Sequence, residues 1–267
     1  MSAPLISSTA LALASLLVLL NAGLSLALGL GVARSLLVGA LRATVQLLLV
    51  GLVLRLVFGT QSPWLVAAVV LLMLAAAGRE VHARQQRRLS GWWGWGVGAL
   101  AATLAALLAA GLGLSLLAHQ PWWAPQALIP VLGIVLGSVM NGVSVTLNAF
   151  TSGVARERAA IEAQLALGAT RRQALGPVQR AALRGGLIPV INQMSAAGII
   201  TLPGMMTGQV LAGMAPLEAA RYQILVLLLL AGGAGLGAIG VSYWAVARVS
   251  DARDRLRLDR LAPPAGR

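Results

Sequence analysis

The side chains best suited to contact a passing solute are amides within strongly apolar stretches. Asn141 and Asn148 lie two helical turns apart, and Asn192 and Gln193 follow in a later apolar stretch. Such amides either line a transport path or hydrogen-bond between helices, a contact worth about 0.6 kcal/mol on average in membranes. We assign Asn141, Asn192 and Gln193 to a path and Asn148 to helix contact.

Arg42 and Gln46 are spaced i, i+4 on one face of an earlier apolar stretch. A central arginine costs roughly 2.5–3.5 kcal/mol on membrane-insertion scales. Arg42 therefore either faces a path or a polar partner, or extends to the nearby interface. Both residues are kept as path candidates.

A tight metal site is not apparent from the sequence. The chain has no Cys, and its two histidines, His82 and His119, are far apart. Thioethers suit soft ions, whereas ferric iron and aluminium prefer oxygen ligands. Methionine inside a membrane protein is also a common filler of irregular space. Met140, Met194, Met205 and Met206 could offer thioethers.

The basic residues exclude several classes of enzyme. All 20 are Arg, so the chain cannot supply the lysine of a nucleotide-binding P-loop or of a Schiff base. No nucleophile–base pair or carboxylate pair lies within an apolar stretch. We therefore expect no enzyme activity of its own and no bound cofactor. The net charge of +13 indicates cytoplasmic loops and lipid contact, not nucleic acid.

The elements that position these residues are membrane helices. The chain is 58% hydrophobic, and about 20 apolar residues cross a bilayer. This predicts an all-α, polytopic membrane protein of about seven transmembrane helices, in one permease domain over residues 1–250 with a short cytoplasmic tail over 251–267. The predicted spans are 8–30, 36–54, 63–79, 92–117, 127–150, 187–213 and 223–247.

The distribution of arginine predicts the orientation. With the N-terminus outside and the C-terminus inside, the outer loops hold only Arg55 and Arg221. Nearly all the other arginines then lie inside, as positively charged cytoplasmic loops require.

A polar loop over residues 155–186 interrupts the apolar pattern. Gly168 is placed to end one helix, and Thr170 with Gln173 forms a capping-box pattern for the next. We expect a short helix from Arg171 that ends at Gly176-Pro177. Such a loop is either an interfacial connector or a rigid element that docks a separate motor.

Several motifs resemble a known family. Glu162-Ala163-Gln164-x-x-x-Gly168 is similar to the E-A-A-x-x-x-G signature with which permeases of ABC transporters contact their ATPase. The stretches LIPVLGIVLGSVMNG (128–142), LGATRRQA (167–174) and LPGMMTGQVLAG (202–213) resemble the FetB-type permeases, which comprise bacterial iron-export and plant aluminium-tolerance permeases. Ser138 stands where that family commonly has Asn.

The resemblance implies a permease subunit in the bacterial inner membrane, exporting iron or a related metal species. It implies a homodimer with two copies of a separate ATPase, which binds the ATP and Mg. It also implies a coupling element between the fifth and sixth spans, made of Glu162, Ala163, Gly168, Ala169, Thr170, Arg171 and Arg172.

The sixth span carries a further signal. Pro203 lacks an amide proton and is followed by Gly204, so we expect a hinge there, with Met205, Met206 and Gln209 near the path. Gly208 is expected to pack against another helix.

Gly233 and Gly237 in the last span are expected to pack in the same way. The open alternatives for the whole chain are a secondary transporter or channel without a motor, and an ABC permease for a small organic solute such as a nucleotide sugar.

Overall fold

The computed structural model describes residues 7–60, 62–89, 92–116, 124–251 and 253–262, and the elements it describes there are helical. The helices group into two compact units, one of Met1–Ser62 with Leu211–Gly213 and one of Pro63–Val210 with Met214–Arg267.

The first unit is a helical hairpin. Helix α1 (Ser8–Ala27) and helix α2 (Ala33–Thr60) pack on each other. The turn between them depends on two residues with positive φ, Gly29 at 64° and Gly31 at 71°, a conformation that glycine adopts without steric cost. The leucines of both helices are largely exposed, as expected of surfaces that meet lipid.

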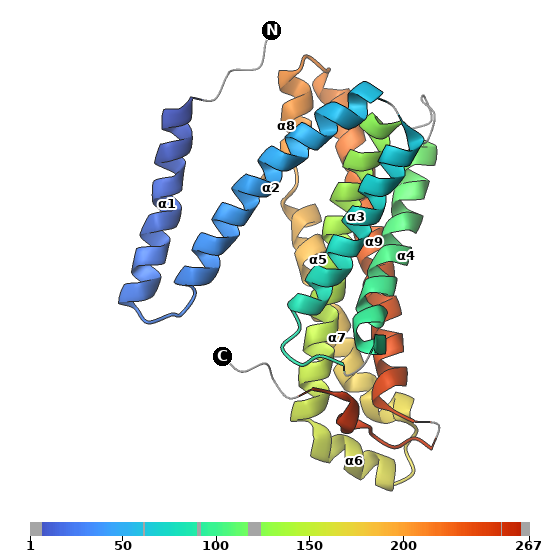
Figure 1. Ribbon diagram of the computed structural model, residues 1–267. Coiled ribbons are helices and arrows are strands. Elements are labelled where there is room, and N and C mark those ends of the chain that lie inside the picture. Colours follow the sequence, from blue (N-terminus) through green and yellow to red (C-terminus); the bar gives the residue numbers. More distant parts are fainter. Residues whose placement is uncertain (1–6, 61, 90–91, 117–123, 252, 263–267) are drawn as a thin grey trace. The chain divides into compact units, whose positions relative to one another are not determined.

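The second unit is a bundle of five long helices: α3 (Pro63–Ala83), α4 (Trp92–Leu116), α5 (Pro125–Arg156), α7 (Arg171–Ala196) and α9 (Pro216–Val249) (Figure 1). Helix α5 contacts all four of the others. Its buried residues, among them Leu132, Val139 and Phe150, form the centre of the core. The fold therefore places α5 at the centre of this unit.

Six of the seven predicted spans form continuous helices in the described residues: Thr9–Ala27, Ala33–Thr60, Pro63–Ala83, Gly98–Leu116, Pro125–Arg156 and Pro216–Val249. The prediction of a continuous helix over 187–213 is wrong. Helix α7 ends at Ala196, and α8 (Gly204–Leu211) begins eight residues later.

The chain between α7 and α8 satisfies its own backbone groups. Gly198 has φ +84°, and the amides of Ile200 and Thr201 both donate to the Ala196 carbonyl at 3.0 Å. The Gly198 amide donates to the Thr201 carbonyl at 2.9 Å. The sequence placed the irregularity at Pro203, but the helix is already broken six residues before it.

Helix α7 also corrects the expected end of the coupling helix. The helix does not end at Gly176-Pro177 but continues through both Pro177 and Pro189 to Ala196. An interior proline costs about 3 kcal/mol or more. Here the burial of Ala174, Leu175 and Val178 in the core offsets that cost.

Helix α3 extends beyond its predicted span. It continues to Ala83, four residues further, so Glu80 lies in its last turn. The Glu80 carboxylate forms an ion pair with Arg84 at 3.2 Å. The extension therefore places a carboxylate at the end of α3.

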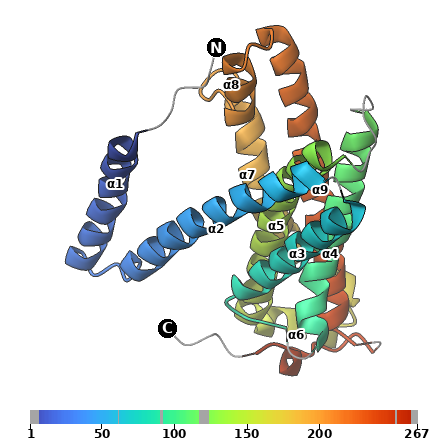
Figure 2. The ribbon, with the colours of Figure 1, turned by 45° about the horizontal axis from the view of Figure 1, so that its top comes forward.

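One end of the bundle carries the polar elements. Helix α6 (Arg158–Ala166) lies across that end, and the 3₁₀ helix η1 (Leu258–Arg260) lies at the same end (Figures 1 and 2). The α7–α8 break and α8 lie toward the opposite end of this unit.

Candidate functional site

A stripe of polar residues runs along one face of α5 and lines three cavities. Asn141, Asn148 and Ser152 recur at intervals of three to four residues or their multiples, which keeps them on one helix face. Asn141 lines the first and second cavities, and Asn148 lines the second and third. The stripe thus passes from the middle of the bundle to the end that carries α6.

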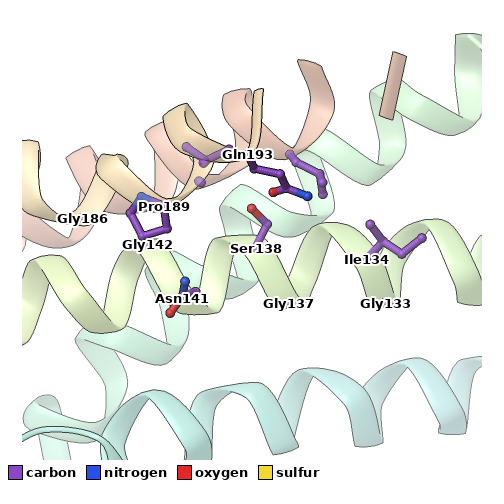
Figure 3. Close-up of a pocket in the computed structure, with 12 residues that line it drawn as sticks. Gly133, Ile134, Gly137, Ser138, Asn141, Gly142, Gly186, Pro189 and Gln193 are labelled. Atoms are coloured by element: carbon purple, nitrogen blue, oxygen red, sulfur yellow. The ribbon is translucent and has the colours of Figure 1, made fainter. Parts of the chain in front are cut away.

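The first cavity lies between α5, α7 and α9 and has a volume of about 310 Å³. Ser138 on α5 and Gln193 on α7 point toward one another across it (Figure 3). Its other lining residues are mostly small or apolar: Gly133, Ile134, Gly137, Asn141, Gly142, Gly186, Pro189, Val190, Leu230 and Ala234. The cavity offers hydroxyl and amide groups and no ionised side chain.

Glycine allows α5 and α7 to cross closely beside this cavity. A Cβ on Gly186 would lie 1.9 Å from Thr146 Oγ1 and 3.0 Å from the Gly142 carbonyl oxygen. The Thr146 hydroxyl is buried and makes no hydrogen bond in the structure. Close packing through small residues is typical of membrane helices, and here it fixes the wall of the cavity.

The second and third cavities, of about 220 Å³ and 260 Å³, continue along α5. They bring α5 together with the segment that follows α3. Asn148 Oδ1 accepts a hydrogen bond from the Gln86 amide at 2.9 Å, and Arg84 lines the second cavity. The third also includes Arg156 and Glu157, which pair at 3.2 Å.

The predicted path residues separate into groups. Asn141 and Gln193 line cavities, whereas Asn192 is exposed and lines none of the three described here. Asn148, which we assigned to helix contact, lines two cavities, and its hydrogen bond joins it to the Gln86 amide in the segment after α3, outside any helix.

The other candidates lie on α8 and α2. Met205 packs against the core, and Gln209 has a buried, unpaired Oε1, but neither they nor Met206 line these three cavities. Arg42 and Gln46 are exposed on α2, in the first unit.

Sequence reasoning missed the contributions of Ser144, Arg84 and Gln86. Arg84 and Gln86 lie more than 50 residues before Asn141 in the chain, and no local pattern indicates where they meet α5. Ser144 stands in the same row as Asn141 and Asn148, so the helical period could have found it.

The predicted packing glycines also differ among themselves. A Cβ on Gly233 would lie 3.0 Å from Val139 Cγ2, and one on Gly237 would lie 2.8 Å from Val143 Cγ2. Both glycines therefore sit at the α5–α9 contact. Gly208 on α8 and Gly204 before it have open space where a Cβ would be.

The turn between α6 and α7 forms a rigid, exposed projection. Gly168 has φ +89°, and Thr170 and Gln173 form both hydrogen bonds of a capping box at the start of α7. Glu162 and Ala163 are exposed on α6, where Glu162 pairs with Arg158 at 2.9 Å. Leu167, which the sequence did not single out, is 89% exposed at the tip. The exposed turn is thus joined directly to the long helix α7.

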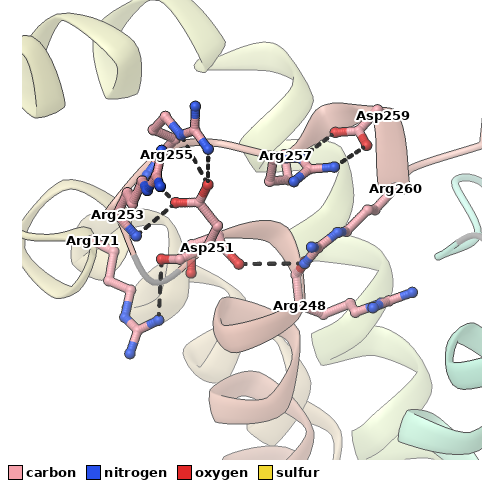
Figure 4. Close-up of polar contacts among 9 residues, drawn as sticks. Arg171, Arg248, Asp251, Arg253, Arg255, Arg257, Asp259 and Arg260 are labelled. Carbon is pink, nitrogen blue, oxygen red and sulfur yellow. Dashed lines mark hydrogen bonds and ion pairs between the residues drawn. The ribbon is translucent and has the colours of Figure 1, made fainter.

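The end of the chain packs beneath the bundle as a structured segment, which we name the C-terminal clip (residues 250–251 and 253–262). Asp251 Oδ1 accepts hydrogen bonds from the amides of Arg253 and Arg255, both at 2.9 Å (Figure 4). Arg260 donates to the carbonyl of Arg248 at 3.0 Å. The clip therefore closes the end of α9.

The clip also reaches two other elements. The Ala262 amide donates to the Arg88 carbonyl at 2.8 Å, and Leu261 is buried beside Leu89 in the core. Arg171, at the start of α7, lies 3.7 Å from Asp254. The clip thus connects the start of α7, the α3–α4 connection and α9, where the sequence predicted only a short tail.

Backbone hydrogen bonds determine the electrostatics of the clip. The amide of Arg255, followed by the Arg255 side chain and the Arg253 amide, lowers the pKa of Asp251. The Arg257 side chain likewise lowers the pKa of Asp259. The described residues contain no group of three or more His, Cys, Asp or Glu side chains that could hold a metal ion.

Long apolar helices around a polar stripe define a multi-pass membrane protein. Residues 8–249 match the model of the uncharacterised protein family UPF0014, and the chain belongs to that family.

Its relatives are named as membrane proteins and permeases. A UPF0014 membrane protein of Synechocystis sp. is 41% identical over 205 residues, which cover 76% of this chain and 78% of the relative. The Probable iron export permease protein FetB of Escherichia coli is 29% identical over 96% of this chain and 97% of its own. The Protein ALUMINUM SENSITIVE 3 of Arabidopsis thaliana is 32% identical over 87% and 83%. No solved structure matches.

Proposed function

We propose that this chain is the permease subunit of an ATP-driven ABC exporter that moves iron or a related metal species out of the cytoplasm. A homodimer of the chain would work with a separate ATPase, which binds ATP and Mg. The α6 end of the bundle would face the cytoplasm, with the N-terminus outside and the C-terminus inside.

The observation that carries this proposal is the α6–α7 turn. A motor can move a membrane helix only if it holds a rigid element attached to that helix. The capping box at Thr170 joins the exposed turn to α7 without a flexible linker, and α7 then runs uninterrupted to the wall of the first cavity. In this proposal Leu167 is the apolar contact inserted into the ATPase, flanked by Glu162, Ala163, Ala169, Arg171 and Arg172.

The cargo assignment comes from a relative and from the path. The Escherichia coli relative is named as an iron export permease. The amides and hydroxyls along α5 are compatible with a metal species that passes without being tightly held.

The test is association and ATP-driven transport with a separate ABC ATPase, for which a neighbouring reading frame that encodes a Walker motif is the candidate. The permease is co-expressed with that ATPase, and both pull-down and iron uptake into inside-out vesicles are measured. We expect Leu167→Asp and Gly168→Val to release the ATPase while the permease stays in the membrane, because Gly168 requires a φ that a β-branched residue resists.

Gly185→Ala is the control, since a Cβ there meets nothing within 4 Å. Unchanged association in both loop variants would show that the turn is only a connector. Iron uptake that persists without the ATPase would instead favour a secondary transporter.

A further inference from the structure

We propose that the second cavity binds an anionic, oxygen-rich form of the cargo, namely a metal ion already held by a carboxylate chelator, and not the bare cation. We name it the donor cavity; it is lined by Arg84, Asn141, Ser144, Val145, Asn148 and Ala149. The inference rests on the proposed function for the statement that the cargo contains a metal.

The orientation of Asn148 is fixed by a backbone group. Its Oδ1 accepts the Gln86 amide at 2.9 Å, so the carbonyl end of the side-chain amide is occupied. The NH₂ group, which carries two N–H donors, is the end left for the cavity. Asn148 thus acts on a bound solute as a donor.

Ser144 supplies a second donor. The residue is only 3% exposed, and its Oγ has no hydrogen-bond partner in the structure. A buried hydroxyl without a partner is unfavourable, and native proteins pair the great majority of such groups. An acceptor oxygen on a ligand in the donor cavity would satisfy it.

Arg84 supplies the positive charge. Its Nε donates to Glu80 at 3.2 Å, which leaves four of the five guanidinium N–H groups. Glu80 does not line the cavity. The ion pair offsets part of the charge of Arg84, so donor groups and not net charge dominate the selection.

These groups together favour a solute with acceptor oxygens over a bare metal cation. Hard metal cations require several oxygen ligands, preferably carboxylates, and no carboxylate lines this cavity. Carboxylate oxygens of a chelate, in contrast, accept from N–H and O–H groups. At about 220 Å³ the cavity is smaller than the ~300–1,000 Å³ of drug-sized pockets, so it holds a small chelate or one face of a larger one.

The experiment measures binding to the purified full-length chain in nanodiscs, without any ATPase. The probes are radiolabelled ferric citrate, ferrous ion under reducing conditions, citrate alone and inorganic phosphate. We expect ferric citrate to bind, citrate alone to compete with it, and phosphate and ferrous ion to bind at least tenfold more weakly.

Asn148→Asp is the decisive variant. It keeps an oxygen for the Gln86 amide and replaces the donor NH₂ by a charged acceptor. We expect ferric citrate to bind at least tenfold more weakly to this variant. Gln126→Glu makes the same chemical change in the exposed first turn of α5, away from the three cavities, and should bind normally.

Ser144→Ala is a second variant that tests the cavity even if Asn148→Asp fails to fold. It removes a hydroxyl that makes no hydrogen bond in the structure. It should fold normally and bind ferric citrate about tenfold more weakly. The inference would be overturned if Asn148→Asp and Ser144→Ala bound ferric citrate as tightly as the unchanged chain. It would also be overturned if ferrous ion bound more tightly than ferric citrate, or if phosphate bound as tightly as ferric citrate. Because the ATPase is absent, such a result leaves the proposed docking untouched; chelate binding without ATPase association would refute the proposed function alone.

Discussion

The contact between Gly186 and Thr146 allows a stability prediction to be worked from distances. A Cβ at Gly186 would lie 1.9 Å from Thr146 Oγ1, about 1.5 Å short of the 3.4 Å at which ordinary contact begins. The Gly142 carbonyl oxygen, at 3.0 Å, belongs to the backbone and cannot rotate away. Gly186→Ala must therefore push α7 away from α5.

Overpacking of this kind costs typically ~1–3 kcal/mol. Two atoms obstruct the new methyl group and one of them belongs to the backbone. We therefore expect Gly186→Ala to lower the free energy of unfolding by about 3 kcal/mol, at the upper end of that range. For a protein of this size that corresponds to a fall in Tm of roughly 6–12 °C. The neighbouring Gly185→Ala should instead leave stability equal or raise it by up to ~1 kcal/mol, since its Cβ meets nothing within 4 Å.

A double-mutant cycle isolates the cause. Thr146→Ala removes the nearer obstacle and loses no hydrogen bond, so alone it should cost about 1 kcal/mol for the lost side-chain atoms. In a chain that already carries Gly186→Ala, Thr146→Ala should restore about 1–2 kcal/mol of the lost stability, a coupling in the range found for contacting residues.

The assay is unfolding of the purified chain in detergent, followed by circular dichroism during SDS titration. The reasoning is refuted if Gly186→Ala is as stable as Gly185→Ala. It is also refuted if the stability losses of Gly186→Ala and Thr146→Ala simply add in the double variant.

Three further predictions concern other parts of the chain. Pro203→Ala should preserve assembly yet impair transport if the segment between α7 and α8 moves as a hinge; normal transport would assign the segment to packing alone. A cysteine at the exposed Glu218 should be labelled from outside in intact cells and one at the exposed Ala159 should not, and the reverse pattern would overturn the proposed orientation. In the C-terminal clip, hydrogen bonds lower the pKa of Asp251 below its ordinary value of 3.8, so the stabilisation that Asp251 provides is present above that value and is lost as the pH falls through the folded pKa. Amide exchange at Arg255 should therefore stay protected from pH 8 to pH 5 and lose protection below pH 3.8, whereas loss already at pH 6 would contradict the role of Asp251.

Local signals in the sequence predicted local structure well. Gly168 adopts the positive φ expected of a glycine that ends a helix, and Thr170 with Gln173 forms the expected capping box. Both depend on residues within a few positions of each other. The predicted helix end at Gly176-Pro177 was wrong because the continuation of α7 past Pro177 depends on burial against α5. Helix propensity, which is a local property, contains no information about that burial.

The candidate site likewise has one part that local sequence predicts and one part that it does not. The row of Asn141 and Asn148 follows from the helical period alone. The donors that complete the cavities come from the segment after α3, and Gln86 meets Asn148 across 62 positions of chain. A single sequence indicates which residues share a face of α5, but only the packed bundle shows what stands opposite them.

The C-terminal clip has a consequence for biosynthesis. Leu261 and Ala262, which close the contact with Leu89 and Arg88, follow α9 in the sequence. The long helices that the structure describes are therefore synthesised before them. The surface around Arg171 is completed only after α9 has been made, so a chain that stops within α9 lacks part of it.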